Sequence, residues 1–530
     1  MLDAASPSYL PLAVAVLGGA LSLLLISWAT RRRDDVSRLP SPSSSEASWL
    51  WGHERRVWDG EACQTHKRWI HEIGHVFRIK AAFGGRDILV AADHHAVQHV
   101  LQNTDRYVMA HAFRTVMGNL IGKGLAWVVG DDHLKLRRFL APAFGPDSVK
   151  RMSDDVVTCA EKLELRLHGD VSHDASQTCE VNILPYISAC TLDVIGRVAF
   201  GHDFQPQSAA PSGDASRIMS SWHKIVAISA TNASFLAPLV LRMFPWITQL
   251  PLPALKAQGE ANVIVRQIAK KLIANANTDD DRRDILSRLL KMNKSQAQFT
   301  EEEIIENIIT FTMVGHETSS GTISFTLLAL ARNKEVQDKL RHEIQQYGQD
   351  LSYDAVQKLE YLEAAVREGI RLFAASPQTD RVALKDDVLP LKSPVQLDDG
   401  SVVRSVYIKR GQIIQIPFGA INADESTWGS DAAAFNPDRW IVAGGVPSPA
   451  DLPHGWSGLL SFSDGPRTCI GYRLAILECK IILARLIRAF VFEDAQCTVR
   501  TKIAPTLQPI ANGVAGNMPL RVRPVNGFGS

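Results

Sequence analysis

The chain has 530 residues, of which 57 are Lys or Arg and 56 are Asp or Glu, so its formal net charge is only +1. This balance excludes the basic excess of a dedicated nucleic-acid binder, and we expect no nucleic-acid partner. Hydrophobic residues make up 46% and charged residues 21%, which excludes wholesale disorder. The seven cysteines include no CxxC pair, and such widely spaced thiols favour a reducing compartment over a disulfide framework.

The N-terminus carries a predicted membrane anchor. Residues 10–29 contain no charged side chain, and a helix of this length covers about 30 Å, the hydrocarbon thickness of a bilayer. Arg31, Arg32 and Arg33 follow directly and favour the cytosolic side. We therefore predict an anchor over residues 1–30, with one transmembrane helix at 10–29. A cleaved signal peptide is the alternative, but its apolar core would be shorter and would follow basic residues.

A polar segment rich in serine and proline comes next. Within residues 31–50, Pro40 and Pro42 favour an extended hinge between membrane and globule. No second linker of this kind and no internal repeat divides the rest of the sequence. Residues 51–530 are therefore predicted to form a single cytosolic domain.

The patterns in this domain are mostly helical. Residues 76–80 and 88–90 read as a hairpin of two short strands. Thr300 and Glu303 have the spacing of a capping box at the start of a long apolar helix. Helices are predicted at about 148–168, 182–200, 255–275 and 300–332. The fold class is therefore mainly α with small β-sheets.

Residues 71–75 (HEIGH) match the HExxH signature of zinc proteases. That chemistry needs a continuous helix, so that both histidines lie on one face. Here Gly74 interrupts the motif, and a strand-like run begins at Val76. We interpret the match as a coincidence at a helix end, with a zinc protease as the alternative that metal analysis would reveal.

Residues 462–471 (FSDGPRTCIG) read as a loop that delivers one thiolate to a metal. Cys469 lies just before the helical pattern at 472–490. The partial positive charge at the start of such a helix favours a thiolate over a thiol. The alternative for an isolated cysteine is a small buried apolar side chain.

The residues around Cys469 suit a flat, acidic cofactor. Gly465 permits a turn that a Cβ would obstruct, and Gly471 lets the backbone approach the cofactor closely. Arg467 can neutralise an acidic group of the cofactor, and Phe462 can cover the side of the sulfur.

The loop fits the pattern FxxGxRxCxG, and in this it resembles the cytochrome P450 family of haem-thiolate monooxygenases, in a fungal-like, membrane-anchored microsomal form. The resemblance implies the cytochrome P450 fold after one N-terminal transmembrane helix, and a haem-binding catalytic domain. It also implies that Cys469 is the axial thiolate ligand of the haem iron.

A second motif lies in the long helix, at residues 315–319 (GHETS). The Thr318 hydroxyl can bond to the carbonyl of Val314, four residues back, and loosen the helix locally. By resemblance to the oxygen-activation segment of the family, Thr318 would organise hydrogen bonds around the bound oxygen. Glu317 would help to relay protons.

Three charged residues resemble the Glu-Arg-Arg network of the family. Glu368 and Arg371 form an ExxR pair, whose spacing places both charges on one helix face. Arg439, in residues 435–439 (FNPDR), would be the third member. The role that the resemblance implies for this network is structural.

Two arginines resemble family residues that meet the haem propionates. Arg137 follows His133 with the WxxxR spacing, although the family often has Trp where this chain has His133. Arg381 matches an arginine on a family strand.

The resemblance implies insertion of one atom of O2, by hydroxylation or a related oxidation, into a lipophilic substrate, with terpenoid-like secondary metabolism as the first expectation. A fatty-acid or xenobiotic hydroxylase is an alternative, and a haem-thiolate isomerase or a haem sensor would be a different class. By family position, the substrate pocket is expected to include Phe113, Val116, Met117, Ala374, Ala375 and Leu507.

The cofactors implied are haem b (iron protoporphyrin IX) and O2 as co-substrate, with electrons from NADPH through a flavoprotein. Too few residues follow Cys469 for a fused reductase, so we expect a separate NADPH-cytochrome P450 reductase, with cytochrome b5 as a second donor. Docking is expected near Arg473, Lys480 and Arg485. The expected location is the endoplasmic reticulum membrane, as a single-pass protein in the lipid bilayer with its catalytic domain facing the cytosol.

Overall fold

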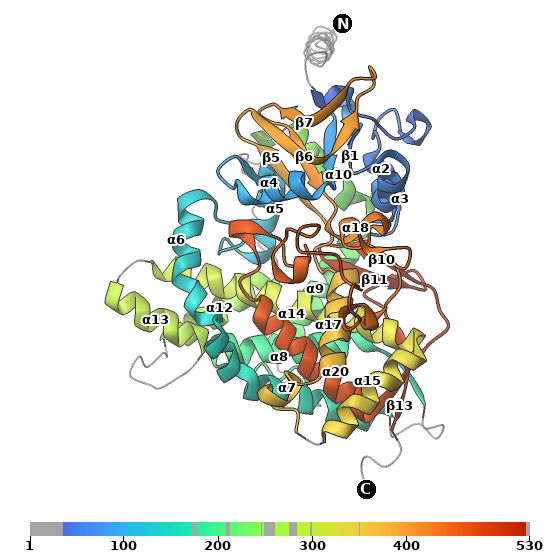
Figure 1. The fold of residues 1–530 in the computed structure, drawn as a ribbon. Helices are drawn as coiled ribbons and strands as arrows, with labels where there is room; N and C mark the ends of the chain where they lie inside the picture. Colours follow the sequence, from blue (N-terminus) through green and yellow to red (C-terminus); the bar gives the residue numbers. More distant parts are fainter. Residues whose placement is uncertain are drawn as a thin grey trace, which may run out of the picture.

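The computed structural model describes residues 35–171, 178–207, 213–244, 246–247, 260–274, 284–296, 299–348 and 350–525. The predicted anchor and the first residues of the predicted hinge lie outside this part. The described chain is mostly helical, and its small sheets lie apart: β1, β5, β6 and β7 are at the top of Figure 1, β10 and β11 lie lower, and β13 is near the bottom. The prediction of a mainly α fold with small sheets is therefore confirmed.

The helices are α2 Glu54–Asp59, α3 Gln64–Ile73, α4 His94–Gln102, α5 His111–Ile121, α6 Gly130–Leu140, α7 Pro146–Val171, α8 Ile183–Phe200, α9 Gly213–Ser229, α10 Asn232–Met243, α12 Glu260–Ala274, α13 Ile285–Gln296, α14 Glu301–Arg332, α15 Lys334–Tyr347, α16 Tyr353–Val356, α17 Glu360–Leu372, α18 Phe418–Ile421, α19 Glu425–Trp428 and α20 Tyr472–Ala489. Short 3-10 turns connect several of them.

Four small sheets accompany the helices. The largest has the strand order β1-β2-β8-β5-β3, in which β2 and β8 run parallel and the other pairs antiparallel. The others are β10-β11-β12, β4-β13-β9 and the pair β6-β7. The strands are β1 Val76–Ile79, β2 Ile88–Ala91, β3 Tyr107–Met109, β4 Cys179–Asn182, β5 Thr379–Ala383, β6 Asp387–Gln396, β7 Val402–Ile408, β8 Ile413–Ile416, β9 Phe490–Asp494, β10 Val499–Ile503, β11 Leu507–Ala511, β12 Val514–Ala515 and β13 Pro519–Pro524.

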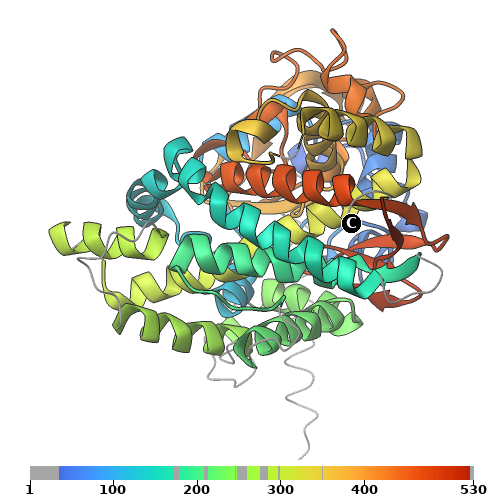
Figure 2. The same cartoon turned by 90° about the horizontal axis from the view of Figure 1, so that it is seen from below.

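The long helix α14 crosses the interior, as its apolar sequence predicts. It begins with the predicted capping box: the Thr300 hydroxyl accepts a hydrogen bond from the Glu303 amide at 3.2 Å, and the Glu303 carboxylate accepts one from the Thr300 amide at 2.8 Å. Helix α8 packs along α14, and α7 packs against both α8 and α20. Figure 2 shows α20, in red, beside the blue-green α7. These packed helices support the cysteine loop, which leads directly into α20.

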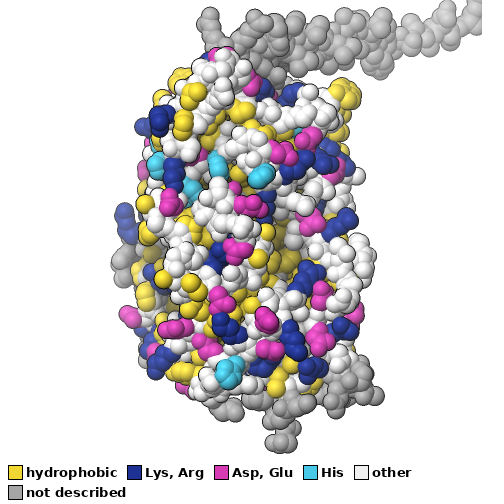
Figure 3. Space-filling model, turned by 45° about the vertical axis from the view of Figure 1, so that its right-hand side comes forward, with side chains coloured by type: hydrophobic (Ala, Val, Ile, Leu, Met, Phe, Trp, Pro, Cys, Tyr) yellow, Lys and Arg dark blue, Asp and Glu magenta, His cyan; other side chains and the backbone are white. Residues whose placement is uncertain are grey.

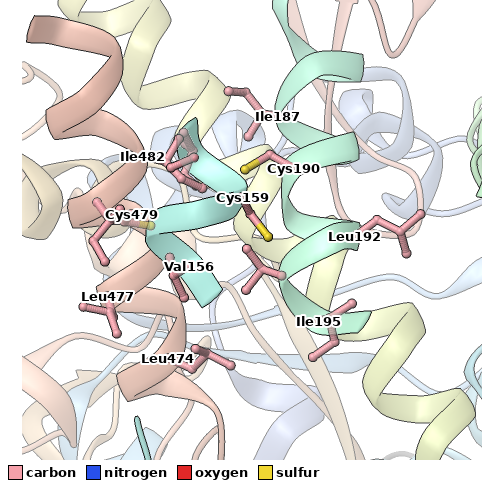
Figure 4. Close-up of a cluster of buried hydrophobic side chains, with 14 of the residues drawn as sticks. Val156, Cys159, Ile187, Cys190, Leu192, Ile195, Leu474, Leu477, Cys479 and Ile482 are labelled. Carbon is pink, nitrogen blue, oxygen red and sulfur yellow. The ribbon is translucent and has the colours of Figure 1, made fainter. Parts of the chain in front are cut away.

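Three cysteines lie inside this helix packing. Cys159 of α7, Cys190 of α8 and Cys479 of α20 are buried among branched apolar side chains (Figure 4). Burial raises the pKa of all three thiols well above the ordinary value. They are therefore protonated and act as small apolar core residues.

The early hairpin is confirmed, and its position rules out a zinc-protease site at residues 71–75. Strands β1 and β2 pair antiparallel, with Phe77 opposite Val90. Helix α3 ends at Ile73, because Gly74 adopts φ +112° and turns the chain into β1. His75 therefore lies outside the helix, where its Nε2 is 3.0 Å from an Asp424 oxygen. Within the described ranges, no group of three or more His, Cys, Asp or Glu side chains could hold a metal ion.

One described helix, α8, is long and apolar enough to cross a membrane. Since 83% of it is buried inside the protein, it is a core helix. The bent pair α9 and α10 passes the same test only when taken together, with a bend of 76°. On the face shown in Figure 3, basic and acidic side chains are interspersed, in keeping with the balanced net charge.

Candidate haem site

The cysteine loop is a tight turn anchored against the N-terminal part of the domain. The Cys469 amide donates to the Phe462 carbonyl at 2.8 Å, and the Thr468 amide donates to the Gly465 carbonyl at 3.0 Å. Gly465 adopts φ +67°, and a Cβ there would lie 2.5 Å from the Leu101 carbonyl oxygen at the end of α4. This position therefore requires glycine, both for its backbone angle and for the close approach of two chains.

The Cys469 side chain differs from the buried core cysteines because solvent reaches it. Desolvation by the surrounding protein raises the pKa of this thiol, while the Gly471 amide and the Arg137 charge lower it. Helix α20 begins at Tyr472, so the thiol lies at the positive end of that helix. Solvent thus reaches this residue although protein surrounds its thiol, and a cation and an amide are placed to stabilise its anionic form.

The position of Gly471 suits a flat group near this sulfur. Its φ of −89° is open to any residue, and a Cβ would meet no protein atom closer than Phe144 Cε1 at 3.9 Å. The backbone angle and the protein packing therefore leave room for a side chain that the sequence does not supply. Phe462, the loop's other flanking residue, packs edge-on against Trp456 with ring centroids 5.5 Å apart.

The middle of α14 opens toward the same region. Between residues 307 and 328, Val314, Gly315 and Thr318 are the three that are partly exposed. As predicted, the Thr318 hydroxyl donates to the Val314 carbonyl, at 2.7 Å. Phe311 lies one turn before Val314 on α14, and its ring packs against the ring of Phe144 with the centroids 5.4 Å apart.

Because Phe144 also lies next to Gly471, the partly exposed stretch of α14 and the cysteine loop are close neighbours. A flat group bound at the loop would therefore be within reach of the Thr318 side of the helix.

Four arginines from separate segments gather near the loop. They are Arg114 of α5, Arg137 of α6, Arg381 of β5 and Arg467 of the loop itself. Desolvation, and then the charges of the other three, lower the pKa of Arg467 to about 10. Desolvation also lowers the pKa of Arg381 to about 10, although Asp380 opposes this. Across the described residues, none of the four forms an ion pair with a carboxylate.

Such a cluster is costly without an anionic ligand. Burying charges of one sign in low dielectric is strongly unfavourable unless an opposite charge compensates them. Arg467 is held by the Val128 carbonyl, whereas the buried Nε of Arg114 has no hydrogen-bond partner among the residues that the structure describes. A ligand with two carboxylates, as haem has in its propionates, would complete this cluster. The donors present therefore fit a haem whose iron meets Cys469.

His133 lies among these arginines but carries no charge of its own. It is buried on α6, and desolvation, followed by the charges of Arg467 and Arg137, lowers its pKa to about 4. The imidazole is therefore neutral at pH 7, and it can offer a hydrogen bond but no charge to an acidic group. Arg114 is the member of this site that the sequence analysis missed, because no motif or spacing marks it.

The predicted Glu-Arg-Arg residues are brought together. Arg371 binds both carboxylate oxygens of Glu368 at 2.8 Å, and both side chains are fully buried. Arg439 Nε lies 3.4 Å from Glu368 Oε1. The carboxylate also accepts hydrogen bonds from the Asn436 amide and from Trp440 Nε1, each at 3.0 Å. Arg371 further binds backbone carbonyls of the segment before the loop, those of Asn422, Ala432 and Ala434.

The profile of the cytochrome P450 family matches residues 42–512 of this sequence. The chain belongs to the cytochrome P450 family. It is 31% identical over 504 residues to cytochrome P450 monooxygenase 205 of Postia placenta, which covers 91% of this chain and 90% of that protein. It is 30% identical over 515 residues to ganoderic acid synthetase CYP5150L8 of Ganoderma lucidum, which covers 91% and 92%.

A third relative, cytochrome P450 monooxygenase claW of Ampulloclitocybe clavipes, is 28% identical over 499 residues, covering 89% of this chain and 91% of that protein. The predicted resemblance to fungal members is therefore confirmed. The protein is a monooxygenase of the oxidoreductase class, and its family works with haem iron, O2 and electrons from a reductase.

The acid of the Glu317–Thr318 pair in this P450 lies on the flank of α14, not on its partly exposed side. Glu317 is 4% exposed, and its Oε1 accepts a hydrogen bond from Gln508 Nε2 at 2.6 Å. Gln508 belongs to β11 and was not among the predicted site residues, because its partner lies 191 positions away in sequence.

The predicted substrate residues occupy two places in this P450. Val116 is 40% exposed and Met117 is half-buried, both on α5. Ala374 is buried and Ala375 half-buried, and the Leu507 amide donates to the Ala375 carbonyl at 2.9 Å. The structure thus brings the second pair and Leu507 together. The side chain of Phe113 lies outside the described residues.

Two of the three basic residues expected to dock a reductase point elsewhere. Lys480 is buried and bonds to Glu363 and Gln357. Arg485 is paired with glutamates of α7, Glu161 and Glu164. That docking prediction is therefore wrong for both, because these positions of α20 face neighbouring helices rather than solvent.

Proposed function

We propose that this P450 uses haem b, whose iron Cys469 would hold, to insert one oxygen atom into a lipophilic, terpenoid-like substrate of secondary metabolism. The observation that carries the haem assignment is one solvent-reached thiol at a helix start, next to four arginines that have no carboxylate partner among the described residues. We further propose that NADPH supplies the electrons through a separate cytochrome P450 reductase, with cytochrome b5 as a second donor.

Each part of the site has a role in this proposal. Bound haem b, with thiolate ligation, supplies the electron density that favours cleavage of the O–O bond. Cys469 would hold the iron, while Arg114, Arg137, Arg381 and Arg467 would hold the propionates and orient the ring. His133 adds a neutral hydrogen-bonding group beside them.

The α14 side of the site handles oxygen and protons. Because the Thr318 hydroxyl already donates to the Val314 carbonyl, its own oxygen is available to accept a hydrogen bond from water at the site. Glu317, one residue earlier, is the nearest acid on this helix and the proposed proton source. The network of Glu368, Arg371 and Arg439 fixes the segment that leads to the cysteine loop.

The acid–alcohol pair favours oxygen chemistry over the alternatives. A haem-thiolate isomerase has no need of a proton source beside a hydroxyl on α14, and a sensor would show no turnover. The reduced, CO-bound difference spectrum of the wild type and of Cys469→Ser tests the ligand: a red-shifted thiolate band is expected in the wild type alone. NADPH consumption coupled to a product then separates an enzyme from a sensor.

The substrate class is proposed from the apolar residues near the site and from the relatives. Ala374, Ala375 and Leu507 carry no charge, and one relative is named a ganoderic acid synthetase. Incubation of the reconstituted enzyme with a panel of terpenoids and fatty acids tests this. Turnover of terpenoids is expected, and turnover of fatty acids alone would replace the terpenoid proposal with the hydroxylase alternative.

We also propose that residues 10–29 anchor the protein in the endoplasmic reticulum membrane, with residues 51–530 in the cytosol. The uncharged run followed by three arginines supports this. Exposed apolar side chains near α10, namely Met243, Phe244 and Trp246, give the domain an apolar surface suited to lie against lipid. A variant without residues 1–30 should lose resistance to alkaline extraction, and full retention in the pellet would contradict the anchor.

A further inference from the structure

The proton-relay acid is held by a residue from a distant hairpin. Gln508 is 1% exposed and Glu317 is 4% exposed, so their 2.6 Å hydrogen bond lies in the interior. The β10–β11 hairpin is fixed at this place, since the next residue back, Leu507, is bonded to the Ala375 carbonyl at 2.9 Å. The contact therefore joins two rigid parts of the fold rather than two mobile side chains.

The Gln508 amide nitrogen has a second contact beside the one to Glu317. The same Nε2 lies 2.8 Å from the Thr506 hydroxyl oxygen. One N–H thus points to Glu317 and the other to Thr506. While Glu317 is ionised, a reversed amide would turn its carbonyl oxygen toward the carboxylate, and two acceptors would repel each other. The Glu317 contact is thus a donor contact from a neutral group.

The second oxygen of the carboxyl group faces a histidine. Glu317 Oε2 lies 3.8 Å from Nε2 of His316, a fully buried residue. His316 Nδ1 lies 2.9 Å from the Thr312 carbonyl. Since a carbonyl only accepts, Nδ1 carries the ring hydrogen. Burial lowers the pKa of this imidazole and favours its neutral form, in which Nε2 is an acceptor. Within the described part of the chain, that atom has no hydrogen-bond partner.

These contacts distinguish the two oxygens of Glu317. Oε1 accepts the amide hydrogen of Gln508, and the oxygen that best accepts is the one that carries no proton. Oε2 faces an imidazole acceptor at a distance that a small side-chain movement or one water can bridge. We propose that Gln508 is a positioning residue for proton delivery: it fixes Oε1, so that the proton Glu317 supplies is carried on Oε2, beside His316. This inference rests on the proposed monooxygenase function.

The proposal states where each proton goes. When Oε2 releases its proton toward bound oxygen, a carboxylate remains whose charge the Gln508 N–H stabilises. Reprotonation of Oε2 from solvent restores the starting state. Without Gln508, the carboxyl group can rotate and place its proton on either oxygen, and the carboxylate loses its donor. Proton delivery through Glu317 would then become slower, and O2 reduced by two electrons from NADPH would be released as H2O2, taking its two protons from water.

The test compares Gln508→Leu, Glu317→Gln and the double variant in the full-length, haem-loaded protein. The first readout is the infrared difference spectrum on photolysis of CO, in which the Glu317 carboxyl bands are those lost in Glu317→Gln. We expect these bands to shift in Gln508→Leu. The second readout is peroxide released per NADPH with reductase, in H2O and in D2O. A hydrogen bond to a charged group changes an equilibrium by roughly tenfold or more, so a several-fold rise in peroxide and a larger solvent isotope effect are expected.

The double variant separates positioning from a merely structural effect. If Gln508 acts through Glu317, the double variant should release no more peroxide than Glu317→Gln alone. Effects that multiply would overturn the proposal, and so would unshifted infrared bands. The matched control is Gln412→Leu, which removes a fully buried amide bonded to the Asp87 and Ile413 carbonyls. It should leave both readouts at wild-type values.

Two checks keep the result interpretable. The CO-bound difference spectrum must be the same in every variant; if Gln508→Leu fails to assemble, Gln508→Asn takes its place, because it keeps the amide but shortens its reach. If the wild type consumes no NADPH, the proposed function fails, whereas the infrared comparison still decides whether Gln508 fixes Glu317.

Discussion

Replacing Glu368 with Gln should be strongly destabilising. The Glu368 carboxylate accepts two hydrogen bonds from Arg371, one from the Asn436 amide, one from Arg439 and one from Trp440. A Gln amide must place its NH2 group against at least two of these donors, so at least two hydrogen bonds are lost. At about 1.5–3 kcal/mol for each bond to a charged group, the loss of two bonds is about 3–6 kcal/mol, which overlaps the roughly 3–5 kcal/mol typical of a broken buried ion pair.

The control for this change lies on the same helix. Glu360, at the exposed first turn of α17, contributes only a favourable charge at a helix start, so Glu360→Gln should cost less than about 1 kcal/mol. Urea unfolding followed by far-UV circular dichroism measures both variants against the wild type. If Glu368→Gln unfolds at the same urea concentration as Glu360→Gln, the network does not stabilise the fold in the way its geometry indicates.

Three other changes test the site and its surroundings. Arg114→Leu should lower the haem-to-protein ratio after purification several-fold, whereas the exposed Arg138→Leu should not; equal ratios would remove Arg114 from the site. Gly465→Ala should destabilise the folded protein by more than about 2 kcal/mol, since a Cβ would meet a backbone oxygen at 2.5 Å. The control Gly400→Ala, with φ +82° in open space, should cost about 1 kcal/mol. Thermal unfolding compares the two variants, and equal losses of stability would contradict the clash. Burial raises the pKa of Glu478 from 4.5 to about 8, so its contribution to stability is present below pH 4.5 and is lost as the pH rises to about 8. The variant Glu478→Gln should therefore be more stable than the wild type by roughly 2–4 kcal/mol near pH 8 and by little near pH 4.5. A gain in stability that does not depend on pH would argue against a buried acid.

The sequence was sufficient where a motif is local. The turn around Gly465 and the cap at Thr300 depend on residues within a few positions, and the structure has both as predicted. The Glu368–Arg371 contact was also predictable, because helical spacing alone places the two charges together.

Other features depend on contacts between distant segments. Lys480 and Arg485 read as surface charges, and the structure pairs them with glutamates of other helices. Gln508 reaches Glu317 only because a C-terminal hairpin packs on α14. Nothing in the sequence near Arg114 or Gln508 indicates these partners, since the neighbours that decide their roles come from tertiary packing.

The four arginines come from α5, α6, β5 and the cysteine loop, which span more than half of the chain. A dianionic cofactor bound among them would tie these segments together and relieve their mutual repulsion, so loading and folding should reinforce each other. A culture short of iron or porphyrin precursor should then yield not merely colourless protein but less protein, because unloaded chains would be cleared by proteases.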